Sequence, residues 1–256
     1  MYLIMLKLSF KEFVMRNCPE VLYHYTSVES LAMILSTKTF KLSPLSVLDD
    51  LQEEKTEDVT QIGRTVFVSS WTDDSKESIP MWNMYSKMES GVRIRAETNL
   101  FETGYVLSGE ISGYKLYNDN RYLFPPELKK VIYTDEIRKI IPKIVGGNKQ
   151  CWNQKELGIY KSKAWEFQNE WRYIVRVWPG RNFDNEDEDI ETIYNKFSLT
   201  MDSYIKFNIE PQIFDKLEIT LSPKISEGNR VIVDSLKYRY CPKLIIHESE
   251  LKECIR

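Results

Sequence analysis

Apolar and polar residues alternate most regularly over residues 168–177 of this chain. From Trp171 onward, the apolar residues Trp171, Tyr173, Val175 and Val177 fall on one face, and Ile174 falls on the other face with Arg172 and Arg176. Alternation of aromatic and β-branched residues with polar ones predicts a half-buried β-strand, with the apolar residues facing the core.

The opposite face of this predicted strand carries polar side chains. Gln168, Glu170 and Arg172 would point the same way if the strand reaches back to Gln168. A carboxylate and an amide presented together can hold a polyol or a ribose. A salt-bridged strand edge is the plainer interpretation, and the pattern alone leaves both open.

A strand followed by a helix is predicted near the start of the chain. Val21–Tyr25 is apolar, and Thr26–Glu29 has the S/T-x-x-E form of a capping box. The residues that follow place Val28, Leu31, Ile34 and Leu35 on one helical face. His24 lies at the end of the strand, where it could contact a ligand, act as a base or serve a structural role.

The remaining patterns predict a mixture of strands and helices without a regular βαβ rhythm. Further strands are expected at Phe40–Leu42, Thr65–Trp71, Gly91–Ala96, Val131–Tyr133, Leu217–Leu221 and Leu244–His247, with a strand and loop region over 104–117. Helices are expected at Ile79–Met88, Ile137–Val145 (shortened by Pro142), before Lys161 and at Glu227–Arg239. This mixture favours an α+β fold, a single domain over 1–256 with mainly antiparallel sheets flanked by helices.

Three segments stand apart from these elements. Residues 1–20 are expected to dock on the body of the domain, and the acidic residues 182–192 to form a mobile surface loop. Residues 48–58 are also acidic and are expected to form a loop and a solvated helix face. A metal site there is the alternative, because several carboxylates fall close together.

Composition narrows the class of protein. The chain has 256 residues, 42% hydrophobic residues and a net charge of −3, typical of a globular protein and not of a sequence-independent nucleic-acid binder. The four cysteines are scattered without zinc-ligand spacing, which suits a reducing cytoplasm. No membrane span is expected, because charged residues interrupt the apolar start early.

Two further clusters carry candidate chemistry. Ser69 and Ser70 place hydroxyls at a strand end, where they would satisfy turn backbone groups or orient a ligand. Trp82 and Tyr85 have helical spacing, typical of core packing but also compatible with a wall of a cleft. A nucleophile elbow, a P-loop and a dinucleotide fingerprint are all absent from the sequence.

Taken in order, these short motifs resemble the bacterial domain-of-unknown-function 2971 family over about residues 20–250. The matching segments are Leu22–Thr26, Leu48–Glu53 (which lacks the family's Asn and Pro), Val66–Ser70, Met81–Tyr85, Gly91-Val92, Val131–Tyr133, and the series Lys161/Lys163, Trp165, Gln168, Glu170 and Arg172. The last motif has Gln168 where the family has a first Glu.

The same order is more distantly similar to the layout of ADP-ribosyltransferases. That resemblance implies NAD as substrate, with Glu170 as the catalytic carboxylate, Gln168 orienting the acceptor and His24 holding the ribose. It also implies that the ligand is contacted by Tyr25, Thr26, Ser69, Ser70, Trp82 and Tyr85. The pattern matches neither subclass of these enzymes completely. One subclass has its tyrosine on a strand, whereas Tyr85 is expected on a helix, and the other subclass has Arg at the position of His24.

The resemblance implies transfer of ADP-ribose to a protein, nucleic acid or small molecule, and it suggests a role in toxin or phage-defence biology. Two other functions stay open. One is a non-catalytic regulatory module that binds a nucleotide or peptide with His24, Trp82 and Glu170. The other is a hydrolase or nuclease using Asp50, Glu53 and Glu170 with a divalent metal. The sequence does not indicate the oligomeric state.

Overall fold

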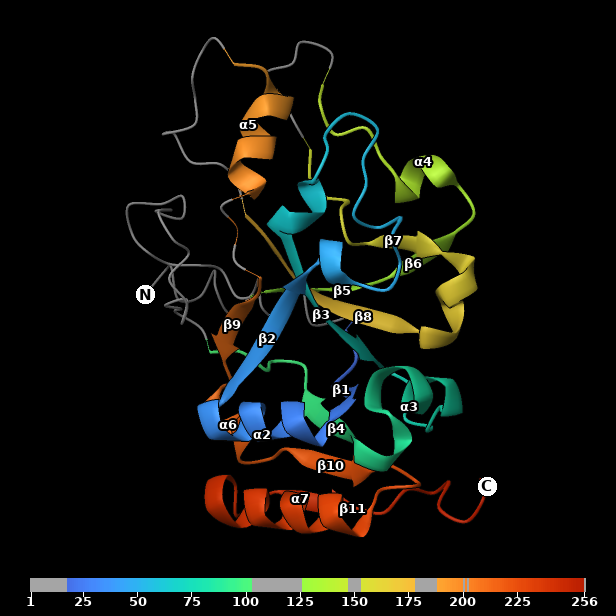
Figure 1. Ribbon diagram of the computed structural model, residues 1–256, viewed down its shortest axis with the longest axis vertical. Coiled ribbons are helices and arrows are strands. Elements are labelled where there is room, and N and C mark those ends of the chain that lie inside the picture. Colours follow the sequence, from blue (N-terminus) through green and yellow to red (C-terminus); the bar gives the residue numbers. More distant parts are fainter. Residues whose placement is uncertain are drawn as a thin grey trace. The chain divides into compact units, whose positions relative to one another are not determined.

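A computed structural model of the chain describes residues 18–102, 126–146, 153–177, 188–199, 201 and 203–255 (Figure 1). The chain divides into two compact units. Unit 1 comprises Met1–Ala32, Thr72–Leu100 and Gln212–Arg256, and unit 2 comprises Met33–Trp71 and Phe101–Pro211. Helices accompany sheets whose strands are mainly antiparallel, so the expected α+β class is confirmed. The single domain over 1–256 stays a prediction.

Unit 1 contains a sheet of four strands. They are β1 (Val21–Ser27), β4 (Gly91–Glu97), β10 (Glu218–Leu221) and β11 (Ile245–His247), accompanied by α3 (Ile79–Ser86) and α7 (Glu227–Tyr240). The order is β11-β10-β4-β1, and only β10 and β11 run parallel. The helix α7 connects that parallel pair (Figure 1). The neighbouring Ile94 and Ile219 are buried and form part of the core.

The turn from β1 into α2 (Val28–Thr37) differs in detail from the sequence prediction. The strand continues to Ser27, and the Ser27 hydroxyl accepts a hydrogen bond from the Ser30 amide at 3.1 Å. Ser27 therefore caps the helix in place of Thr26. The difference is one residue, because Thr26 keeps extended backbone geometry inside β1.

Unit 2 contains a five-stranded sheet and a separate strand pair. The sheet has the order β9-β2-β3-β8-β5, formed by β9 (Ile205–Asn208), β2 (Thr39–Pro44), β3 (Val66–Thr72, of which Thr72 belongs to unit 1), β8 (Glu170–Arg176) and β5 (Glu127–Lys130). The pair is β6 (Ile132–Thr134) and β7 (Tyr160–Ser162), which run parallel. The helices are α4 (Ile137–Ile140) and α5 (Ile190–Ser198), and α6 (Pro211–Phe214) lies at the unit boundary.

An aromatic cluster forms much of the core of unit 2. Trp71 of β3 packs against Tyr173 of β8 with ring centroids 5.9 Å apart. Phe40 lies 5.1 Å from Trp71, and Phe101 lies 4.9 Å from Tyr173. This burial confirms that Tyr173 belongs to the apolar face of the strand, as its alternation predicted.

The strand β8 itself corrects two expectations. It begins at Glu170, because Lys163–Gln168 form a 3₁₀ helix and Asn169 adopts a left-handed backbone with φ of 42°. It is also not half-buried, since Glu170 and Arg172 on its polar face are as buried as its apolar residues. Strands on both sides, β3 and β5, exclude the interpretation of a strand edge.

Other predicted elements are shorter than expected or lie outside the described residues. The helix from Ile137 ends at Ile140, ahead of Pro142, and the segment before Tyr160 contains turns where a helix was expected. Residues 1–17, 103–125 and 178–187 are outside the described part, including most of the docking segment, the 104–117 region and much of the acidic loop. The end of that predicted loop is helical, because α5 begins at Ile190.

Candidate functional site

Arg172 is the centre of a buried ionic cluster in unit 2. Its side chain has no exposed surface, and Nε donates to Glu170 Oε1 at 2.6 Å while Nη2 donates to Glu170 Oε2 at 3.0 Å. The same guanidinium bonds both carboxylate oxygens of Glu53 through Nη1 and Nη2. Arg172 thus joins two carboxylates at once, in the bidentate geometry that suits a planar guanidinium.

Lys161 supplies the second positive charge. Its ammonium donates to Gln168 Oε1 at 2.8 Å, and it lies 3.1 Å from Glu53 Oε1 and 3.3 Å from Glu170 Oε2. The ring of Trp165 lies 4.8 Å from the same nitrogen. The cluster is therefore charge-balanced, with two carboxylates and two cations, as buried ions require.

These contacts set the protonation of Glu170. Burial by itself would raise the pKa of its carboxyl, but the charges of Arg172 and Lys161 and hydrogen bonds from Arg172 and Ser70 outweigh burial and lower the pKa to about 2. The pKa of Arg172 is raised, because its two carboxylates outweigh its burial. At neutral pH the Glu170 carboxyl is therefore ionised.

The local fold explains why these side chains converge. Tyr133 on β6 lies in register with Lys161 on β7, and its hydroxyl accepts a hydrogen bond from the Glu170 amide at 2.9 Å. The Gly158 carbonyl accepts from Arg172 Nη1 at 3.1 Å. Gly158 has φ of +80°, a conformation that glycine adopts readily and other residues rarely do.

Ser69 and Ser70 were expected at a strand end, but they lie inside β3, which continues to Thr72, and they have separate roles. The Ser69 hydroxyl accepts a hydrogen bond from the Trp71 indole at 3.0 Å, so its contact is within its own strand. The Ser70 side chain hydrogen-bonds Glu170. The structure therefore brings Ser70, Gln168 and Glu170 together around one ionised carboxylate, as the motif order led us to expect, while Ser69 serves the aromatic core.

Glu53 is the member of the cluster that the sequence analysis misplaced. Its segment was expected to be a solvated acidic stretch, yet Glu53 is buried with Arg172 and Lys161 as partners. Asp58 of the same segment also has a structural contact, because its carboxylate accepts hydrogen bonds from the amides of Ile144 and Val145. The signal available in the sequence was the Asp and Glu of Leu48–Glu53, one of the segments on which the resemblance rests. The suggested metal site finds no support, because no group of metal-binding side chains occurs among the described residues.

The other predicted site residues lie in unit 1. Trp82 is fully buried, with its ring edge-on to Tyr25 at 4.8 Å and its indole donating to Glu77 at 2.8 Å. Trp82 is therefore a core residue, and its buried ring is not available for stacking on a ligand. The Tyr25 hydroxyl accepts from the Ser78 amide at 3.0 Å and supports the start of α3.

Strand alternation separates the three consecutive residues His24, Tyr25 and Thr26. His24 pairs with Ile94, and it shares a sheet face with Thr26 and not with Tyr25. Thr26 is buried, whereas His24 and Tyr85 are partly exposed. The proposed ribose and nicotinamide contacts in unit 1 thus reduce to His24 and Tyr85.

Comparisons of the chain with protein-family models, curated proteins and solved structures found no match. Among the described residues, every helix is too short or too polar to cross a membrane. The site must therefore be judged by its own chemistry. It contains the carboxylate of Glu170, the hydroxyl of Ser70 and the amide of Gln168, together with the buried cations Arg172 and Lys161.

Proposed function

We propose that this protein binds NAD and transfers ADP-ribose to an acceptor, with Glu170 as the catalytic carboxylate. The observation that carries the proposal is the Glu170 carboxylate at the start of β8, which Arg172 and Lys161 hold in place and which is hydrogen-bonded to Ser70 of β3. In the reaction, the bond between the ribose and nicotinamide breaks and nicotinamide leaves with the electron pair. The acceptor's nucleophile then bonds to the ribose carbon and loses its proton.

Electrostatics support this role for Glu170. Positive charge develops on the ribose as nicotinamide leaves, and a preoriented negative charge stabilises it. With a pKa of about 2, the carboxylate is ionised at any physiological pH. Gln168, which shares Lys161 with Glu170, would orient the acceptor.

The proposed reaction requires a ribose hydroxyl to reach the carboxylate of Glu170. Its side chain is 4% exposed, and both oxygens already accept hydrogen bonds. The longest of its contacts to a charged group is that to Lys161, at 3.3 Å. A ribose hydroxyl would therefore replace the Lys161 ammonium at Oε2, while Arg172 keeps the carboxylate in place.

The test is to incubate the protein with NAD labelled in its adenylate part, together with a cell lysate, and to measure released nicotinamide and labelled acceptor. We expect Glu170→Gln to reduce both by about 100-fold or more, since it removes the charge and keeps the shape. Glu53→Gln is the matched control, because it removes the same charge from the same cluster without touching the proposed reaction. Thermal unfolding of both variants corrects for loss of folded protein.

Two outcomes would refute the transferase. One is a wild-type protein that releases no nicotinamide and labels nothing. The other is a failure of the Glu170→Gln variant to differ in activity from its comparison protein, whether it is as active as wild type or no less active than the folded Glu53→Gln variant.

The burial of Glu170 favours a second candidate, a non-catalytic regulatory module that binds a nucleotide or peptide. In this case the ionic cluster only shapes the fold, and no bond is broken. A thermal-shift screen with NAD and other nucleotides distinguishes the two functions. Stabilisation by a ligand that stays intact over time supports binding alone, whereas consumption of the ligand supports the transferase.

A further inference from the structure

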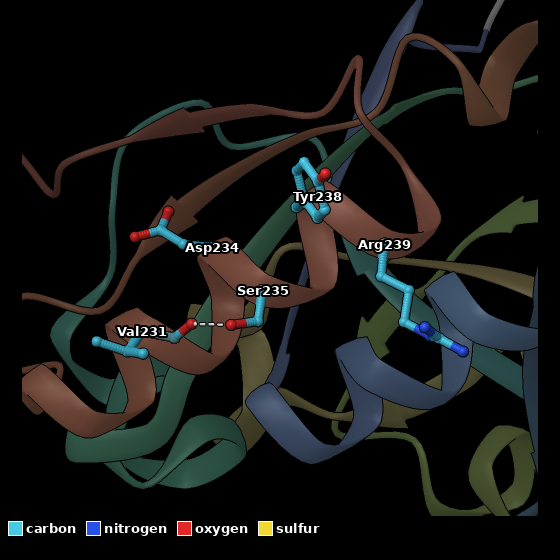
Figure 2. A pocket seen from close by; sticks show the side chains of 5 residues that line it. All are labelled: Val231, Asp234, Ser235, Tyr238 and Arg239. Atoms are coloured by element: carbon cyan, nitrogen blue, oxygen red, sulfur yellow. Dashed lines mark hydrogen bonds between the residues drawn. The ribbon is translucent and has the colours of Figure 1, made fainter.

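Along its exposed face, α7 carries a stripe that includes two exposed apolar side chains. Val231 and Tyr238 are 62% and 87% exposed, and both line a surface concavity together with Asp234, Ser235 and Arg239 (Figure 2). The Ser235 hydroxyl donates to the Val231 carbonyl at 2.8 Å, so it needs no outside acceptor. The opposite side of the helix is anchored by Val233, which is fully buried.

The spacing of the stripe is that of a helix that pairs with another helix. Gly228, Val231, Ser235 and Tyr238 follow one another at intervals of three, four and three residues, the a and d positions of a heptad. Small residues at Gly228 and Ser235 alternate with the larger Val231 and Tyr238. A side chain added at Gly228 would meet no atom within 4 Å, so packing within the chain does not explain this glycine.

The charged residues beside the stripe are complementary to those of a second, identical helix. In the same heptad Asp234 takes a g position, and Arg239, the fifth residue after it, takes the following e position. In a parallel helix pair a g residue faces the e residue five positions further along the other helix. An identical helix therefore presents Arg239 to Asp234 and Asp234 to Arg239. An antiparallel pair would instead bring the two Asp234 side chains to the same edge.

We propose that α7 is a homodimerisation helix, which packs in parallel against α7 of a second copy of this chain around a two-fold axis. The interface is isologous, with the stripe on itself and two symmetry-related ion pairs between Asp234 and Arg239. Close approach occurs at Gly228 and Ser235, and the Tyr238 rings of the two copies cover each other.

The experiment measures the oligomeric state by sedimentation over a wide range of protein concentration. We expect a dimer whose dissociation constant rises about tenfold or more in Asp234→Arg and in Arg239→Asp, because each creates like-charge contacts. Glu253→Arg, a reversal of an exposed charge outside α7, should leave the dimer unchanged. Circular dichroism checks that each variant is folded.

A mixture of the two single variants provides the decisive test of the parallel pairing. Asp234→Arg and Arg239→Asp carry complementary charges, so an equimolar mixture should form heterodimers and recover the wild-type dissociation constant. The double variant Asp234→Arg/Arg239→Asp should also recover it by itself. A protein that stays monomeric at all concentrations, or a dimer that both single variants leave intact, would overturn the proposal.

Discussion

The guanidinium of Arg172 hydrogen-bonds both carboxylate oxygens of Glu53, a residue that precedes it by 119 positions in the chain. This contact ties the acidic segment 48–58 to the central strand β8. Neither side chain has measurable exposure to solvent. Each ion therefore depends on the other for the solvation that water would otherwise provide.

Removing the central cation should destabilise the fold severely. Arg172→Met leaves Glu53 and Glu170 buried with Lys161 as their one remaining cation, so we expect a loss of about 3–5 kcal/mol in the free energy of unfolding. Urea denaturation of wild type and variant measures this difference in the free energy of unfolding. Arg138→Met, at an exposed position, is the control and should change stability by less than about 0.5 kcal/mol. A loss below about 1 kcal/mol in Arg172→Met would contradict the central role of Arg172.

Glu170 should make the fold sensitive to acid. Its folded pKa of about 2 lies below the ordinary 4.5, so the ionised carboxylate stabilises the native state above pH 4.5. That stabilisation is lost as the pH falls from 4.5 through 2. The shift of about 2.5 pH units corresponds to a contribution on the order of 3 kcal/mol. Denaturant titrations at successive pH values would show this decline, which should be much smaller in Glu170→Gln. An equal decline in both proteins would show that other groups control acid unfolding.

The close approach of the acidic segment to Gly63 gives a steric prediction. A Cβ at Gly63 would lie 2.6 Å from Cβ of Glu54 and 2.8 Å from its Cα, too close for either backbone to stay in place. We expect Gly63→Ala to cost about 1–3 kcal/mol of unfolding free energy. Gln52→Ala alters an exposed side chain of the same segment and should be nearly neutral. Equal stability of Gly63→Ala and wild type would show that the segment moves away at little cost.

We predict that Trp82 contributes to the stability of the fold and does not contact a ligand. Its ring is fully buried against Tyr25 and its indole hydrogen-bonds Glu77, so Trp82→Ala should cost about 3–5 kcal/mol in thermal or urea unfolding. Met84→Ala removes an exposed side chain from the same helix and should cost less than about 1 kcal/mol. A stable Trp82→Ala protein that has lost only its affinity for NAD would restore the original binding hypothesis.

The candidate site was predictable in part. The motif order selected Ser70, Gln168 and Glu170, and the structure brings these three together. The sequence analysis left a salt-bridged strand open, and Arg172 pairs with both Glu170 and Glu53. The burial of Glu53 was missed, because a carboxylate in an acidic run normally lies in water and its two cations come from distant parts of the chain.

The sequence by itself determined the α+β class and the positions of β1, β3, β4, α3, β8 and α7, because local periodicity and capping residues act within a few positions. Only the tertiary structure decided the role of each face. Alternation marks Glu170 and Arg172 as a polar face, but it cannot tell whether water or other ions will solvate it. That depends on Glu53 and Lys161, which long-range folding brings to the strand, and burial then turns a row of polar residues into the ionic centre of unit 2.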